Sequence, residues 1–307
     1  MYAVTFTASG KCLVSGSDEG VGVWRVRDGE RKAKMQMKDS ARCVAVSKDG
    51  RWIAAGSGDG EVCVWDATSY EQVFADRVGI SSTVNVIYAV DFSPDSTQLV
   101  AASSNGAATI FDIAARVRVQ TFHHAATWAL VAKYSPRGDQ VATASSDSIR
   151  IWDAKDGRSL VDIKIPVNPW YGLLWFDSHL FVVANDNKVK RIDSNGSTVS
   201  DWSVPHSDYT ACIALLQHGE YVAYSAGNAI RFWSTSTRTQ HHLITRYNDI
   251  CSIAFSPDNQ LAIGAEKGRI VITKLSFVKV SSAACVHLFP FLSFSFTLRI
   301  PGTGNSY

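Results

Sequence analysis

Residues 54–67, AAGSGDGEVCVWDA, decide the fold, because the same pattern returns along the chain. Close copies are VSGSDEGVGVWRV at residues 14–26 and ATASSDSIRIWDA at residues 142–154. Each copy joins two short β-rich runs through a turn rich in Gly, Ser and Asp, which is typical of a hairpin. The sequence therefore predicts a repeated β-unit.

Four weaker copies align with these on their last aromatic position, and they cover residues 101–113, 182–194, 222–235 and 262–275. The seven equivalent positions are Trp24, Trp65, Phe111, Trp152, Ile192, Trp233 and Thr273, separated by 41, 46, 41, 40, 41 and 40 residues. In the second unit, residues 42–47, 52–57 and 61–66 are predicted strands. Fourth strands are predicted after the later units, for example at residues 117–122 and 239–245. Four strands in a period of about 40 to 45 residues indicate a propeller blade.

We therefore predict an all-β fold, a seven-bladed β-propeller of four-stranded antiparallel blades, over residues 1–280. Met1 begins inside the first predicted strand, so we expect the seam of the ring to be incomplete at the N-terminus. Residues 276–280, SFVKV, are expected to supply the outer strand of the seventh blade, or that edge is bare.

The units resemble WD repeats, whose terminal dipeptide is present as Trp65-Asp66 and Trp152-Asp153. The resemblance implies a structural hydrogen-bond network in a blade, linking a turn Asp, a second-strand Ser or Thr, the third-strand Trp and a His before the first strand. The residues that match parts of this pattern are Asp18, Trp24, Asp59, Trp65, Asp66, Asp147, Trp152, Asp153, His206 and Trp233. His206 is the only histidine we place in good register, so we expect no blade to have the full network and burial between blades to provide most of the stability.

The overall composition argues against several classes of partner. Lys and Arg total 30 against 28 Asp and Glu, a net charge of +2, so we do not expect nucleic acid to be the ligand. The six cysteines form no CxxC pair, which suits a reducing compartment. The N-terminus lacks the pattern of a secretory signal. We expect the protein in the cytoplasm or nucleus.

The sequence offers no site for catalysis, a metal or a cofactor. The turn aspartates recur once per blade and would not converge on one substrate. The adjacent pairs His123-His124 and His241-His242 point to opposite faces of a strand, so neither is a natural chelate. Phosphate-binding and nucleophile motifs are absent from the sequence. We expect no catalytic residues, no metal, no cofactor and no small-molecule substrate.

The loops that enter the first strands are the candidate partner site. In WD-repeat propellers these loops lie on the top face, and their positions here are Ser40, Val86, Trp128, Pro169, Tyr209 and Asp249. Aromatic residues gather along four consecutive loops, and exposed aromatics are enriched at interfaces. The candidate partner-binding residues are Trp128, Trp170, Tyr171, Tyr209, Tyr247 and Asp249. The alternative is that these aromatics wedge between blades.

The most economical function is a non-enzymatic scaffold or recognition module that binds other proteins or peptides, as a monomer within a larger complex. Alternatives are a propeller fragment of a larger signalling or assembly protein, a propeller enzyme, a membrane tail-anchored propeller and a nucleic-acid-binding propeller. Fold alone does not name the partner.

Residues 281–307 are predicted to be a tail outside the propeller. No charged residue lies between Lys279 and Arg299. The run is just long enough for a membrane anchor, but His287, Pro290 and repeated Ser weaken that interpretation. A surface strand pair would expose several Phe residues. We favour translation of an unspliced intron that starts at Val280-Ser281, in a fragmentary gene product, so membrane binding is expected only if residues 281–299 are genuine.

Overall fold

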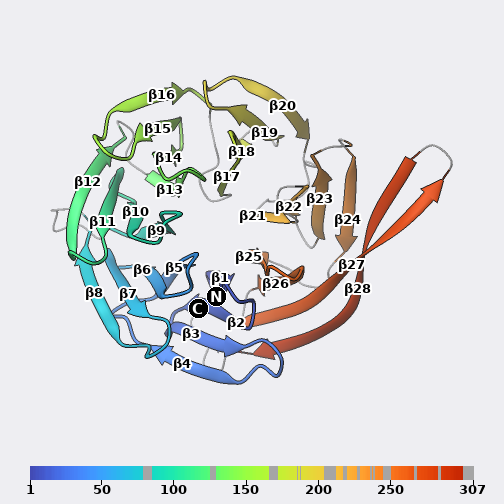
Figure 1. The fold of residues 1–307 in the computed structure, drawn as a ribbon, viewed down its shortest axis with the longest axis horizontal. Coiled ribbons are helices and arrows are strands. Elements are labelled where there is room, and N and C mark those ends of the chain that lie inside the picture. The colour runs from blue at the N-terminus through green and yellow to red at the C-terminus, as the bar shows by residue number, and fades with distance from the viewer. Residues whose placement is uncertain are drawn as a thin grey trace.

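The computed structural model describes residues 1–78, 85–124, 129–165, 172–184, 186, 188–203, 212–216, 220–226, 229–235, 237, 239–244, 250–265, 268–282 and 285–299. Their strands form seven four-stranded antiparallel sheets, arranged as blades around a central axis (Figure 1). The predicted seven-bladed β-propeller is confirmed. Blade one is β1 to β4, and each following group of four strands is the next blade.

The strands have the same order in every blade, from the axis outward (Figure 1). The innermost strands are β1 (Ala3–Phe6), β5 (Ala41–Val46), β9 (Ile87–Phe92), β13 (Ala129–Tyr134), β17 (Leu173–Phe176), β21 (Ile213–Leu216) and β25 (Ile250–Phe255). The second strands are β2 (Cys12–Ser17), β6 (Trp52–Ser57), β10 (Gln98–Ser103), β14 (Gln140–Ser145), β18 (His179–Ala184), β22 (Tyr221–Ala226) and β26 (Gln260–Ala265). The third strands are β3 (Gly20–Arg25), β7 (Glu61–Asp66), β11 (Ala107–Asp112), β15 (Ile149–Asp153), β19 (Lys188–Asp193), β23 (Ala229–Ser234) and β27 (Arg269–Ser282). The outer strands are β4 (Arg31–Met35), β8 (Gln72–Arg77), β12 (Val117–His123), β16 (Ser159–Ile163), β20 (Thr198–Ser203), β24 (Gln240–Ile244) and β28 (Cys285–Arg299).

Burial follows the position of a strand within its blade. The second and third strands of blade two, β6 and β7, are buried on both faces at five of their six residues. Its outer strand β8 has a single buried residue, Phe74. Both faces of the middle strands contact neighbouring blades, which is why small and apolar residues occupy most of their positions.

Apolar clusters between neighbouring blades hold the ring together. One cluster joins Val100, Ile110 and Phe122 of blade three to Tyr134 and Trp152 of blade four. Trp152 stacks on Phe122 of the preceding outer strand with ring centroids 5.2 Å apart. Trp233 of blade six stacks in the same way on Trp202 of blade five, at 4.6 Å. The third-strand aromatic therefore joins its own blade to the one before it.

The outer edge of blade seven differs from the prediction. Residues 276–280 continue β27, and the outer position is held by β28, whose residues from Phe294 to Arg299 pair with those from Lys274 to Arg269. The prediction that residues 276–280 form the outer strand was wrong. Third strands such as β7 and β15 end at an Asp that accepts turn N–H groups, whereas the run LSFVKV, which has no Asp, Gly or Pro, follows Lys274 and extends the strand. The predicted domain boundary at residue 280 stays a prediction.

Candidate functional site

The predicted partner-binding residues Trp128, Trp170, Tyr171, Tyr209, Tyr247 and Asp249 lie outside the described residues, as does His206. These six predicted partner-binding residues, called the rim arc below, therefore stay a prediction.

Three of the third-strand tryptophans, Trp24, Trp65 and Trp152, are buried, and two of these have a hydroxyl partner. The indole Nε1 of Trp24 donates to Ser15 Oγ at 2.8 Å, and that of Trp152 donates to Thr143 Oγ1 at 2.7 Å. In blade two the pairing register places Ala55 at the equivalent position, within the same apolar cluster as Trp65. Trp233 is half-buried against Trp202. These tryptophans pack between blades.

Blade four contains a histidine that the sequence analysis did not assign to the repeat network. His124 Nε2 lies 2.5 Å from Thr143 Oγ1, which also accepts the Trp152 indole N–H. Burial lowers the pKa of His124 to about 4, so the ring is neutral at pH 7. The expectation that His206 is the only histidine in register was wrong. His124 precedes Trp152 by 28 residues and His206 precedes Trp233 by 27, so spacing measured from the tryptophan would have found both.

Most of the turn carboxylates accept hydrogen bonds from residues of their own turns. Asp147 Oδ1 accepts from Ser145 Oγ at 2.7 Å, and Asp59 accepts from Ser57 in the same way. Asp66 and Asp153 each accept two backbone N–H groups of the turn that follows, which lowers the pKa of both carboxyls. Asp18 accepts the hydroxyl of Tyr2 at 2.7 Å.

The described residues include no group of three or more His, Cys, Asp or Glu side chains that could hold a metal ion. His123 is exposed while its neighbour His124 is buried, so the two rings lie on opposite faces of the chain there. Within the same residues, no helix is long and apolar enough to cross a membrane.

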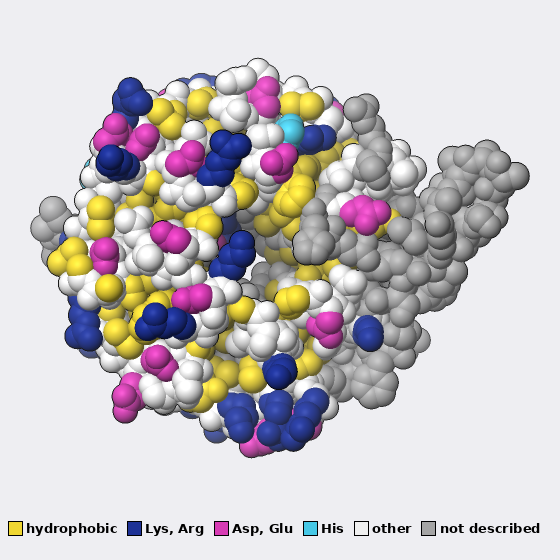
Figure 2. All heavy atoms as spheres, viewed as in Figure 1, with side chains coloured by type: hydrophobic (Ala, Val, Ile, Leu, Met, Phe, Trp, Pro, Cys, Tyr) yellow, Lys and Arg dark blue, Asp and Glu magenta, His cyan; other side chains and the backbone are white. Residues whose placement is uncertain are grey.

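A hollow of about 370 Å³ opens where the innermost strands of blades two to five end. Its apolar wall comes from Val46, Phe92, Tyr134, Trp175 and Phe176, and Lys48 is an exposed cation at its edge. This is the opposite end of the strands from the loops that carry the predicted rim arc. Figure 2 shows the ring face-on, with hydrophobic and charged side chains around a central hollow.

Fixed polar contacts hold the wall of this channel-mouth hollow. Asp91 accepts from Lys133 Nζ at 2.7 Å and from the backbone N–H of Tyr134 at 2.9 Å. The Tyr134 hydroxyl donates to Gln98 Oε1 at 3.1 Å, and burial raises the pKa of this phenol. Because Asp91 and Lys133 satisfy one another, the hollow offers a rigid aromatic surface with Lys48 beside it.

A family model described as "Nucleolar protein 10-like, N-terminal domain", a β-propeller, matches residues 4–192, more than half of the chain. The chain belongs to this family of WD-repeat β-propellers. The resemblance drawn from the Trp-Asp dipeptides is thereby confirmed.

Curated relatives match this WD-repeat propeller over part of their length. "WD repeat-containing protein 1" of Xenopus tropicalis is 38% identical over 114 residues, which cover 36% of this chain and 18% of that protein. "Periodic tryptophan protein 2 homolog" of Dictyostelium discoideum is 28% identical over 76% of this chain and 26% of that protein. "Pre-mRNA-processing factor 19 homolog 2" of Arabidopsis thaliana is 26% identical over 69% of this chain and 41% of that protein. The chain thus spans well under half of the length of these relatives.

A chain in the solved "Crystal Structure of Mitotic Checkpoint Complex" has the same fold, with a TM-score of 0.73 and 16% identity. The match covers 87% of this propeller and 86% of that chain. At this identity the likeness concerns the fold alone.

Proposed function

We propose that this WD-repeat propeller is a non-enzymatic recognition module that holds another protein within an assembly. The observation that carries the proposal is the hollow at the channel mouth, where Tyr134, Trp175 and Phe176 form an aromatic wall on a rigid sheet scaffold. Large aromatics in a partly open, preorganised pocket are the residues that most often provide binding energy between proteins. The names of the relatives, which include a pre-mRNA-processing factor, support an assembly role.

Trp175 packs against the apolar cluster of blades four and five but keeps part of its surface open. It is half-buried, and the equivalent places, one residue before the end of each innermost strand, hold smaller side chains such as Thr5, Ala45 and Ala254. A tryptophan that keeps part of its surface open suits an apolar side chain of a partner. We assign Trp175 as the anchor of the hollow and retain the rim arc as a second contact surface on the opposite face.

The test is capture of the native partner by the tagged full chain. Trp175→Ala and the rim variants Trp128→Ala, Trp170→Ala and Tyr209→Ala are each expected to weaken capture by about 1 to 4 kcal/mol. Val199→Ala is the matched control, because Val199 lies on an outer strand with 49% of its surface exposed. Circular dichroism of each variant shows that the fold is kept. Unchanged capture by all four variants would remove both surfaces from consideration.

The family description and the relatives' names also favour a nuclear or nucleolar location over the cytoplasm. Imaging of the tagged chain in its own cells tests this, and a purely cytoplasmic signal would contradict it.

A further inference from the structure

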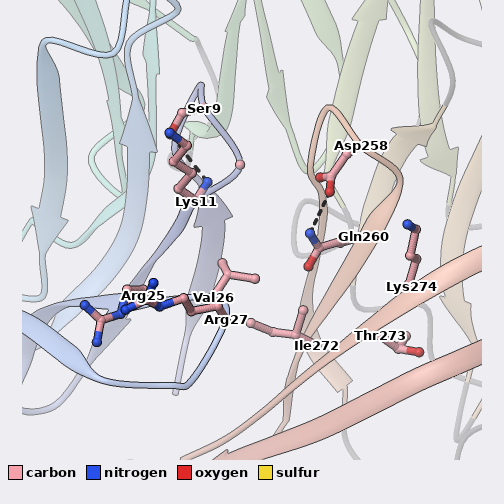
Figure 3. Close-up of a pocket in the computed structure, with 11 residues that line it drawn as sticks. Ser9, Lys11, Arg25, Val26, Arg27, Asp258, Gln260, Ile272, Thr273 and Lys274 are labelled. Atoms are coloured by element: carbon pink, nitrogen blue, oxygen red, sulfur yellow. Dashed lines mark hydrogen bonds between the residues drawn. The ribbon is translucent and has the colours of Figure 1, made fainter.

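A second groove, larger than the channel-mouth hollow, lies between blades one and seven (Figure 3). Its volume is about 880 Å³, within the roughly 300–1,000 Å³ of typical ligand pockets. Val26 and Ile272, which belong to one buried apolar cluster, line it, and Asp258 and Gln260 line it from the first hairpin of blade seven (Figure 3). We call this the seam groove.

Beside the seam groove, blade one has a glycine where blade two has an aromatic residue. Tyr70 lies five residues after Trp65, at φ 60°, and packs against the apolar cluster that joins blades one and two. Gly29 lies five residues after Trp24, at φ 71°, in a turn with the same backbone hydrogen bond. The Tyr70 side chain therefore covers the junction between blades one and two, whereas Gly29 has no side chain to cover the equivalent surface between blades seven and one.

The open surface carries an excess of basic side chains. Lys11, Arg27 and Lys274 are exposed along it, and the Arg27 side chain retains 75% of its surface although it contacts Asp28. Arg25 is engaged by Asp28 and Glu30. The acidic residue of the lining is Asp258, whose pKa is held below its ordinary value by hydrogen bonds from Ser256 and Gln260 and by the charge of Lys274. The groove is therefore complementary to a negatively charged ligand.

We propose that the seam groove binds an acidic peptide segment of a partner protein. The carboxylates of the peptide face Lys11 and Arg27. Single-stranded nucleic acid is the less suitable ligand, because such sites rely on aromatic side chains that stack with bases, and the described lining contains none. The proposal adds a third surface to the recognition module and does not depend on the channel-mouth hollow.

The test uses the full chain and a fluorescein-labelled peptide of Glu, Asp and Leu only, with fluorescence anisotropy as the readout. We expect Lys11→Glu combined with Arg27→Glu to weaken binding at least tenfold. The matched control is Arg137→Glu combined with Lys155→Glu, which makes the same charge change at two exposed turn residues of blade four. That variant should stay within twofold of the wild type, and the same peptide with Gln and Asn in place of its acids should not bind.

A second variant, Gly29→Tyr, covers the groove without changing its charge. The backbone there has the conformation in which blade two holds Tyr70, so the fold is expected to be kept, and binding should fall at least fivefold. Three results would overturn the proposal: no binding of the acidic peptide, an equal loss in the blade-four control, or tighter binding of oligouridylate that the groove variants abolish. Loss of partner capture in Trp175→Ala with intact peptide binding would separate this site from the channel-mouth hollow.

Discussion

Blades three and four have the same strand order but differ in the chemistry that joins their strands. Before blade four, the His124 N–H donates to Gly106 O at 2.9 Å, and before blade three the Val78 N–H donates to Gly60 O at 3.1 Å. Blade four then places Thr143 and Trp152 where blade three places Ala101 and Phe111. Three polar groups of one blade are thus replaced by three apolar groups in the other.

The two sets fill equivalent positions. In blade four the Thr143 hydroxyl contacts both His124 Nε2 and the Trp152 indole N–H, whereas His124 Nδ1 is buried without a hydrogen-bond partner. In blade three Val78, Ala101 and Phe111 belong to one apolar cluster, and Phe111 also packs against Phe74 of blade two at 5.4 Å. The hydrogen-bond network is therefore one of two ways to fill the same space, and burial between blades is common to both.

The first prediction tests the burial between blades, which blades three and four have in common. Trp152→Ala and Phe111→Ala should each lower the free energy of unfolding by about 3 to 5 kcal/mol, because both delete a large buried side chain between two blades. Urea denaturation measures both variants, with Val199→Ala as the exposed control. A loss in Trp152→Ala several times that in Phe111→Ala would mean that the polar contacts, and not the volume, stabilise blade four.

The third-strand aromatic positions could be predicted because each repeat keeps them at a nearly constant spacing, from Trp24 to Trp233. His124 was missed because it was considered only with His123 as a metal pair, whereas its role depends on a hydroxyl 19 residues further along the chain. The pairing of β28 could not be predicted, because it depends on where the long β27–β28 hairpin turns. Trp175 was not singled out within the run LLWF. Alternation along a strand predicts which face a side chain lies on, but it does not predict how much of that side chain remains exposed to solvent.

The second prediction uses pH to separate the two blades. His124 has a pKa of about 4 in the folded chain against about 6.5 when unfolded, so below pH 6.5 the unfolded chain binds a proton that the folded chain does not. Stability should fall as the pH is lowered from about 6.5 to 4, by about 2 to 3 kcal/mol in total from this one group.

The comparison variant is His124→Gln, which keeps a hydrogen-bonding side chain but does not titrate. Denaturation midpoints of the wild type and this variant, measured from pH 7 to pH 4, should converge as the pH falls, and His179 and the carboxyl groups contribute equally to both curves. Parallel curves over this range would show that His124 is not the neutral buried group that the structure indicates.

The third and smallest effect comes from converting blade four into the apolar form of blade three. Thr143→Val alone should cost about 1 to 3 kcal/mol, because it leaves the Trp152 indole N–H and the His124 ring without their shared partner. The triple change His124→Val, Thr143→Ala and Trp152→Phe removes all three polar groups together and copies the residues of blade three, so its stability should lie within about 1.5 kcal/mol of the wild type. Urea denaturation of both variants makes the comparison. A triple variant less stable than Thr143→Val would show that the space in blade four is shaped for its polar residues, and that the two ways of filling a blade are not interchangeable.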